Sequence, residues 1–247
     1  ERERENTIYS HLMHAKWHNN KINIIDTPGF DDFIGEVVSS LKVSDTALIL
    51  LNAASGVEVG TEIVWEYVQN YQTPALFVIN QMDHPKADYD TTLEQAKNRF
   101  GNKVIPIQYP YNSGEKFNSI IDVLRMTMYV FPENGGKPEK MPIPTSELEK
   151  ANALHNALVE AAAENEEGLM EKYFEKGNLD EEELAKGLTI ALAHQQIYPV
   201  FCASGLKDMG SGRIMGFIDD IAPSPADRPA KKLENGAELK CDASDKT

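Results

Sequence analysis

Three short polar motifs carry the side chains in this chain that could do chemistry. Each of them directly follows a run of apolar residues. The motifs are Asp26-Thr27-Pro28-Gly29, Asn80-Gln81-Met82-Asp83 and Ala203-Ser204-Gly205. Open α/β sheets bind ligands just beyond the carboxyl ends of their strands, so three motifs in these places indicate one shared binding site.

The residue types in these motifs suit a nucleotide. The Asp26 carboxylate could hold a magnesium ion through water, and Gly29 leaves a backbone N–H free to approach a terminal phosphate. Asp83 could accept two hydrogen bonds from guanine, a pairing that adenine cannot make. Asn80 would bridge this loop to the rest of the pocket, and the N–H groups of 203–205 could meet guanine O6.

Strands and helices alternate in the first part of the chain, which predicts βαβ units and an α/β sheet. The segment Thr7–Trp17 is expected to form a β-hairpin with the strand Ile22–Ile25. Thr46–Asn52 has the continuous apolar character of a strand buried on both faces. The other elements expected here are helices at Asp31–Leu41, Thr61–Tyr71 and Asp88–Phe100 and a strand at Ala75–Asn80.

The pattern changes after Asn102. Val104–Tyr111 is β-like, Phe117–Tyr129 remains ambiguous, and Pro132–Pro144 is rich in residues that interrupt helices and strands. The elements expected beyond it are helices at Glu147–Glu164, Asp180–His194 and Gly210–Ile221 and a buried strand at Tyr198–Ser204. A linker, Ala222–Pro229, then leads to what reads as the start of a β segment at Lys231–Thr247.

Composition excludes several classes of protein. The 247 residues are 41% apolar and 26% charged, and the longest strongly apolar run is too short to span a bilayer, so no membrane association is expected. The net charge of −15 argues against sequence-specific nucleic-acid binding by this chain. The opening residues do not resemble a signal peptide and only two cysteines are present, which favours a reducing, cytoplasmic location.

The chain resembles the GTPase region of the elongation factor G family over nearly its full length. The stretches that carry the resemblance are RENTI (4–8), INIIDTPGFDDF (22–33), NQMD (80–83), LMEKYFEKGNLDEEEL (169–184), PVFCASGLKDMG (199–210) and PSP (223–225). The helical part between Asn102 and Gln195 is similar to the subdomain that this family inserts before the last strand of its GTPase domain. Tetracycline-resistance ribosomal-protection proteins belong to the same superfamily and stay an alternative.

The resemblance implies roles for particular residues. Thr7 matches the switch I threonine that binds magnesium, Asp26 the magnesium-linked acid, and Gly29 the γ-phosphate sensor of switch II. Asn80 and Asp83 match the readers of guanine. The residues that match the support of the base loop are Ser204 and Gly205. The implied ligands are GTP or GDP with Mg²⁺, and the implied partner is the ribosome.

A contact with the ribosomal stalk protein is also suggested by the resemblance, through the acidic helices of the inserted subdomain. The acidic run Glu164–Tyr173 lies in this region. Its simpler interpretation is the solvated end of a helix.

Two residues depart from the family pattern. Phe30 stands where the family has a histidine that positions the attacking water, so GTP hydrolysis is expected to be slow. The alternatives are hydrolysis that uses another group, or a Phe30 side chain packed under switch II. Gln81 stands where the family has a lysine that covers the base and bridges to the phosphate loop. Affinity should therefore weaken while guanine selectivity, which depends on Asp83, remains.

The chain contains no G-x-x-x-x-G-K-[ST] phosphate loop. The expected fold is a Ras-like P-loop GTPase domain with a mostly parallel sheet, whose P-loop and first strand would precede Glu1, and an inserted α+β subdomain. On this view the chain is an internal fragment of a longer protein, and its sheet has a gap of one strand. The resemblance implies GTPase activity for the intact protein, and the chain alone is expected to be inactive because it lacks the P-loop. The expected division is 1–102 partial GTPase domain, 103–196 insert, 197–222 last strand and helix, and 223–247 linker with the start of a second domain.

Overall fold

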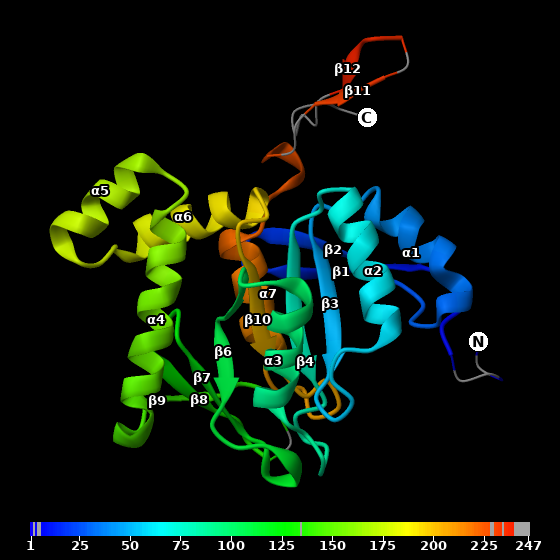
Figure 1. Ribbon diagram of the computed structural model, residues 1–247. Helices are drawn as coiled ribbons and strands as arrows, with labels where there is room; N and C mark the ends of the chain where they lie inside the picture. The colour runs from blue at the N-terminus through cyan, green and yellow to red at the C-terminus, as the bar shows by residue number, and fades with distance from the viewer. Residues whose placement is uncertain (2, 4–5, 134, 228–229, 234, 240–247) are drawn as a thin grey trace.

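The computed structural model describes residues 1–247 except 2, 4–5, 134, 228–229, 234 and 240–247. The first two residues of the RENTI stretch and the last part of the expected β segment therefore lie outside the described residues. The elements are shown in Figure 1.

A four-stranded parallel sheet forms the centre of the molecule, in the order β3-β4-β10-β5. Its strands are β3 (Ala47–Asn52), β4 (Ala75–Asn80), β10 (Tyr198–Cys202) and β5 (Val104–Pro106). All three pairings are parallel. The expected α/β fold with a parallel sheet is confirmed.

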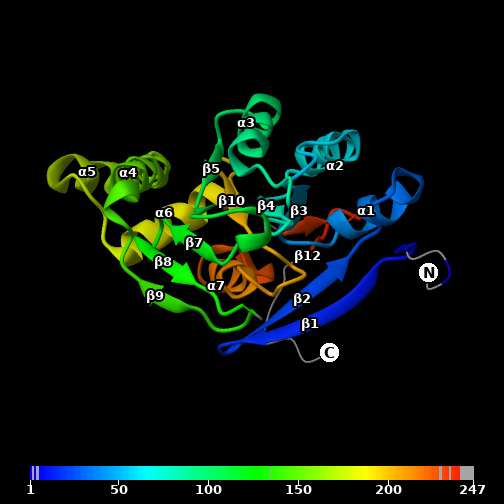
Figure 2. The same cartoon turned by 90° about the horizontal axis from the view of Figure 1, so that it is seen from below.

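Helices cover both faces of this sheet (Figure 2). The helices α2 (Val59–Asn70) and α3 (Tyr89–Phe100) lie on one face, and α7 (Ser211–Ile221) lies on the other. Successive residues of β4 point to opposite faces of the sheet and pack against the helices on each side. Phe77 stacks on Phe100 of α3, with ring centroids 5.0 Å apart, whereas Leu76 and Val78 belong to the apolar cluster that includes Phe217 of α7.

A second sheet, antiparallel throughout, lies beside the first in the order β6-β7-β8-β9. Its strands are β6 (Gln108–Pro110), β7 (Ser119–Asp122), β8 (Thr127–Val130) and β9 (Glu139–Met141). The ambiguous stretch Phe117–Tyr129 is therefore mostly a hairpin, and Pro132–Pro144 supplies an edge strand. β5 lies in the parallel sheet, although the expected division assigned it to the insert.

Three helices follow the second sheet, where the sequence pattern predicted two. They are α4 (Leu148–Ala163), α5 (Glu167–Lys176) and α6 (Glu181–Ala193). The acidic run was interpreted as the end of a helix, but α5 is a separate helix that begins within it. α5 ends at Lys176, and the residue that follows, Gly177, has a φ of 70°, a conformation that glycine adopts without strain. The expected capping box of α6, formed by Asp180 and Glu183, is present.

The N-terminal hairpin forms a sheet of its own. β1 (His11–Trp17) pairs with β2 (Asn20–Asp26) in antiparallel register, and no pairing joins β2 to β3 among the described residues. β2 and β3 therefore belong to different sheets, and the expected one-strand gap between them stays a prediction. The prediction that Thr46–Asn52 is buried on both faces is wrong, because Leu48 and Leu50, on the face that α2 leaves uncovered, are 43% and 56% exposed.

The hairpin is attached to the rest of the protein at its two ends. At the turn, Asp219 of α7 accepts hydrogen bonds from His18 and Asn20, both over 2.7 Å, and Trp17 packs against Gly212 and Gly216. At the other end, the Ser10 N–H donates to the Glu36 carboxylate over 2.8 Å. Glu36 belongs to α1 (Ile34–Leu41), which follows the short 3-10 helix η1 (Asp31–Phe33).

The C-terminal segment carries a short antiparallel pair, β11 (Lys231–Lys232) with β12 (Glu238–Leu239). It extends away from the two sheets in Figure 1, after the 3-10 helix η4 (Pro225–Asp227). A β segment was expected here. No helix in the described part of the chain is long and apolar enough to cross a lipid bilayer.

A buried carboxylate joins the second sheet to α7. Asp122 of β7 is 2% exposed and accepts hydrogen bonds from the Gln108 side chain, over 3.0 Å, and from the Arg125 N–H, over 2.9 Å. The Arg213 guanidinium of α7 lies 3.5 Å from the same carboxylate and 4.8 Å from the centre of the Tyr129 ring. The charge of Asp122 is therefore compensated within the protein rather than by water.

We expect Asp122→Ala to lower the free energy of unfolding by about 3 kcal/mol. The change leaves buried donors without an acceptor and the Arg213 charge without its partner. Urea denaturation of this chain measures the loss. Asp220→Ala is the matched control, because Asp220 lies in an exposed ion pair with Arg125 and should contribute less than about 1 kcal/mol. Equal losses in the two variants would contradict the role given to Asp122.

We also expect the hairpin to loosen from α7 in acid. The hydrogen bonds from His18 and Asn20 lower the pKa of Asp219 below its usual value. Their contribution to stability is therefore complete above the unfolded-state pKa of about 3.9 and is lost as pH falls through the lower folded-state value. The fluorescence emission of Trp17, measured in a Trp65→Phe background, should shift to longer wavelength only below about pH 4. Asp219→Asn should abolish this pH-dependent step, and a step that persists would show that another group controls it.

Candidate functional site

The two loops expected to read a base lie side by side at the carboxyl ends of β4 and β10. The Gly205 N–H donates to the Asn80 side-chain oxygen over 2.9 Å, and the Met82 N–H donates to the Ala203 carbonyl over 3.1 Å. Adjacent parallel strands end at the same edge of a sheet, which brings these distant residues together. The bridging role predicted for Asn80 matches this geometry.

The second loop is a tight turn from Ser204 to Met209. These two residues exchange backbone hydrogen bonds of 2.9 and 3.0 Å, and the buried Ser204 hydroxyl accepts from the Lys207 N–H over 3.1 Å. The hydroxyl therefore holds the turn closed from inside. Ser204 supports the loop, as the resemblance implied.

The N–H groups of 203–205 were expected to be free to meet a base, and the geometry differs from that expectation. They already donate to Ile79 and Met209 carbonyls and to the Asn80 side chain. The reason is the tight turn itself, which satisfies its own amides. In the part of the chain that the structure describes, Leu206 carries the first backbone N–H after residue 205 that donates to no acceptor.

Asp83 lies at the mouth of the first loop with its side chain half-buried. Among the hydrogen bonds and ion pairs of the described residues, none engages its carboxylate. A half-buried carboxylate without a partner is costly unless a ligand or water satisfies it. The donor-rich edge of a guanine base is a ligand of this kind.

Gln81 lies two positions before Asp83 in the same loop and has a φ of 62°, a conformation unusual for any residue but glycine. Its side-chain oxygen accepts a hydrogen bond from Asn52, at the end of β3, over 3.1 Å. Gln81 therefore braces the loop against the neighbouring strand. The contact with Asn52 was not predicted, because Asn52 belongs to none of the sequence motifs.

The hairpin register places Thr7 and Asp26 at one end of the molecule. Asp26 is paired with His11, four positions after Thr7, so both candidate magnesium ligands lie at the same end of the hairpin. The Asp26 side chain is exposed and Thr7 is half-buried. No group of three or more acidic, histidine or cysteine side chains in the described residues could hold a metal by itself.

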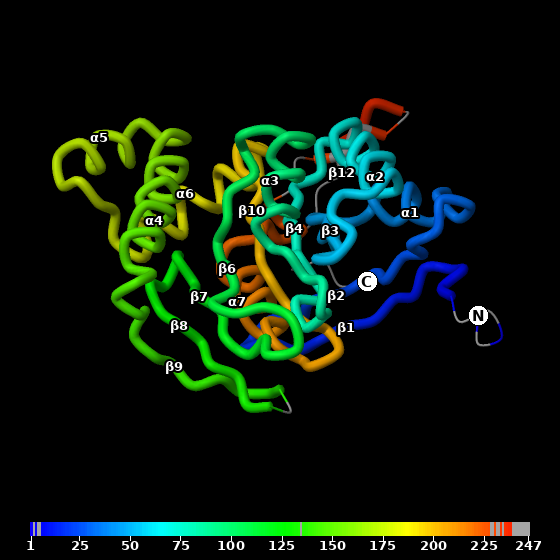
Figure 3. Tube along the Cα trace, turned by 60° about the horizontal axis from the view of Figure 1, so that its bottom comes forward, coloured from blue at the N-terminus to red at the C-terminus, as the bar shows by residue number. Residues whose placement is uncertain are grey.

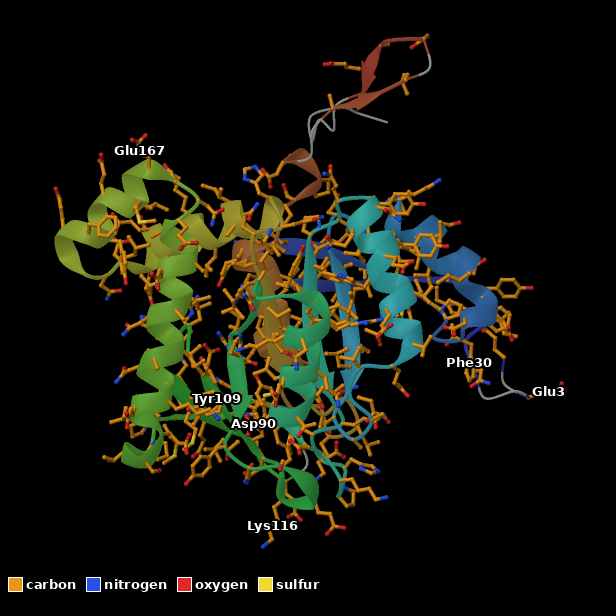
Figure 4. All side chains as sticks on the ribbon, in the orientation of Figure 1. Glu3, Phe30, Asp90, Tyr109, Lys116 and Glu167 are labelled. Atoms are coloured by element: carbon orange, nitrogen blue, oxygen red, sulfur yellow. The ribbon has the colours of Figure 1, made fainter. Side chains whose placement is uncertain are left out.

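Gly29 and Phe30 lie between β2 and η1. A Cβ atom built on Gly29 meets nothing within 4 Å, so its backbone is open to a ligand. Phe30 is 57% exposed, and its carbonyl accepts the Phe33 N–H that begins the 3-10 turn. Figure 4 shows Phe30 on the same side of the protein as Glu3. The alternative of a Phe30 side chain packed under switch II is therefore wrong, because more than half of its surface is exposed.

The inserted subdomain also contacts both of the loops expected to read a base, and sequence reasoning missed these contacts. The Gly114 N–H donates to the Met82 carbonyl over 2.8 Å, and the Lys207 ammonium donates to the Glu115 carbonyl over 3.0 Å. Figure 3 shows the loop after β10, in orange, close to the green loop between β6 and β7. No local sequence signal announces a contact that spans 92 positions.

Comparisons with known proteins agree with this geometry. The elongation factor Tu GTP binding domain family matches residues 1–224. A crystal structure of a Thermus thermophilus protein superposes with a TM-score of 0.83 and 29% sequence identity. The match covers 91% of this chain and 33% of the Thermus chain, so the chain spans one third of that relative's length.

The family match covers most of the chain. The expected Ras-like GTPase fold with an inserted subdomain is confirmed, and guanine-nucleotide binding follows from the family. This chain belongs to the elongation factor Tu GTP binding domain family and is a translational GTPase domain of the elongation factor G type.

Proposed function

We propose that the intact protein binds GTP and GDP with Mg²⁺ and acts on the ribosome during translocation, with slow hydrolysis of GTP. The chain spans one third of its Thermus relative, so the activity of the whole protein is part of this proposal. The single observation behind slow hydrolysis is Phe30. An exposed hydrocarbon ring occupies the position where the family places its water-orienting histidine.

Base recognition is assigned to Asp83. Its carboxylate accepts the N1–H and the exocyclic amine of guanine, while the amino group of adenine offers no matching pair of donors. The buried Ser204 turn and the Asn80 bridge hold the two loops at a fixed separation. The loop that carries Asp83 is therefore in place before the base binds, which lowers the entropy cost of binding. Gln81, held by Asn52, contributes no charge to this pocket.

Phosphate and magnesium are assigned to the hairpin end. Thr7 and Asp26 offer oxygen ligands, which suit Mg²⁺, and the open backbone at Gly29 suits close approach of a phosphate. When bound, the ion neutralises charge on the phosphate oxygens. The protein's own part at this end is therefore to hold and orient the ion and the phosphate. The Phe30 side chain has no polar atom that could hold or polarise water.

Phe30 also favours a second candidate, a ribosome-binding module that does not hydrolyse GTP and works by occupancy alone. A tetracycline-resistance ribosomal-protection protein is a further member of the same superfamily. The division into a GTPase domain, an insert and the start of a second domain is part of the proposal, as are the stalk contact through the acidic helices and a cytoplasmic location.

We expect Phe30→His in the intact protein to raise ribosome-stimulated GTP hydrolysis by about 100-fold, the usual contribution of a positioned acid–base or water-orienting group. Phosphate release with and without ribosomes measures the effect. Phe30→Leu is the control, because it keeps an apolar side chain and should leave the rate unchanged. Strong stimulation of the wild-type protein, equal to that of the histidine variant, would mean that another group orients the water.

We expect Asp83→Asn to weaken GDP binding by about 100-fold or more and to shift preference toward xanthosine diphosphate. The substitution exchanges an acceptor for a donor, which suits the carbonyl oxygen of xanthine. Competition binding to the intact protein gives both affinities. Asp90→Asn, at an exposed position on α3, should change neither. A variant that loses GDP without gaining the xanthine nucleotide would argue against direct base reading by Asp83.

A further inference from the structure

The inserted subdomain holds both guanine-reading loops from outside the nucleotide site. Two of its loops are involved: residues 114–116, the 3-10 helix η2 before β7, and residues 135–136 between β8 and β9. We call these the two bracing loops. Each makes a backbone contact with a different part of the base-reading apparatus.

The first bracing loop fixes the segment that carries Asp83. The Gly114 N–H donates to the carbonyl of Met82, the fully buried residue just before Asp83. A Cβ on Gly114 would lie 3.8 Å from the His84 carbonyl, so the backbones pass close to one another on both sides of Asp83. The backbone that carries Asp83 is therefore held on both sides.

The second bracing loop presses against the 204–209 turn. A Cβ on Gly135 would lie 1.9 Å from the Lys207 carbonyl, and Gly135 has a φ of 75°, so only glycine fits this approach. The Gly136 N–H points to the Asp208 carbonyl over 3.5 Å. The turn that supports the base is therefore confined between the two bracing loops.

Lys207 links the turn to the first bracing loop, and its carbonyl lies against the second. Its N–H donates inward to the Ser204 hydroxyl and its ammonium donates outward to the Glu115 carbonyl over 3.0 Å. The ammonium borders an open hollow of about 530 Å³ that Glu115 and Glu133 also line. Lys207 thus connects the inside of the guanine-reading turn, through its backbone N–H, with the inserted subdomain, through its half-buried side chain.

We propose that Lys207 is a positioning residue that lengthens the lifetime of bound guanine nucleotide by tying the 204–209 turn to the Glu115 carbonyl. The inference rests on the proposed nucleotide binding and goes beyond it by assigning control of release to the insert. Release of guanine requires the two base loops to separate, and the bond to Glu115 opposes that movement. A partner that draws the ammonium into the hollow, by offering a carboxylate, would speed release.

The test is the dissociation rate of a fluorescent GDP analogue from the intact protein, measured by stopped flow after addition of excess GDP. Lys207→Met keeps the length and apolar stem of the side chain and removes the donor. We expect dissociation to become about 3- to 10-fold faster, the range for loss of one hydrogen bond. The association rate should stay within about twofold, because the bond acts after the base has entered.

Two further variants separate positioning from general stability. Lys116→Met is the matched control, since Lys116 is exposed in the same bracing loop and Figure 4 shows it pointing away from the protein. It should dissociate GDP at the wild-type rate. Lys207→Arg retains a donor and should restore slow release. The melting temperatures of all the variants are measured alongside, and faster release at an unchanged melting temperature supports positioning.

An unchanged dissociation rate in Lys207→Met overturns this inference and leaves the proposed nucleotide binding intact. Faster release that Lys207→Arg fails to restore, or that Lys116→Met shares, also overturns it. If Lys207→Met unfolds, Lys207→Gln takes its place, because the shorter amide cannot reach Glu115. A wild-type protein that binds no GDP would contradict the proposed function itself.

Discussion

The pairing of β4 with β10 is the constraint on which the site depends. These strands lie more than a hundred positions apart, yet Phe77 is paired with Val200 and Ile79 with Cys202. Every residue of these two strands except Asn80 is buried, so a slip of one residue would turn a whole row of apolar side chains to the wrong layer. The register that results fixes where each strand ends. The two loops then meet without any long-range signal of their own.

The position of the insert also depends on the pairing of strands in the parallel sheet. It leaves the parallel sheet after β5 and returns at β10, and both of these strands are neighbours in the sheet. Its own sheet is tied to α7 through the buried Asp122 and to the loops through Gly114 and Lys207. An inserted unit attached only at its two ends could swing as a body. These cross-links instead hold it against the loops that are proposed to read the base.

The sequence predicted elements whose pattern is local. β4 is found at the expected residues, and the capping box at Asp180 marks the start of α6. Residues 80, 83 and 204 were placed correctly at strand ends because parallel sheets put their ligand sites there. α5 was missed because its acidic first turns were interpreted as the solvated end of the preceding helix. The burial of β3 was misjudged because periodicity cannot say whether anything covers a face. The Lys207 contact is a tertiary feature, and no pattern of spacing encodes it.

The uncovered face of β3 has a consequence for this chain when it is alone in solution. β3 is an edge strand of the central sheet and presents Leu48 and Leu50 beside unpaired backbone groups, a combination that favours pairing with strands of other molecules. The net charge of −15 at neutral pH opposes such encounters through repulsion between like-charged molecules. Colloidal stability and strand pairing are therefore in competition. Acid or high salt weakens the repulsion and leaves the leucine-bearing edge free to seed assemblies.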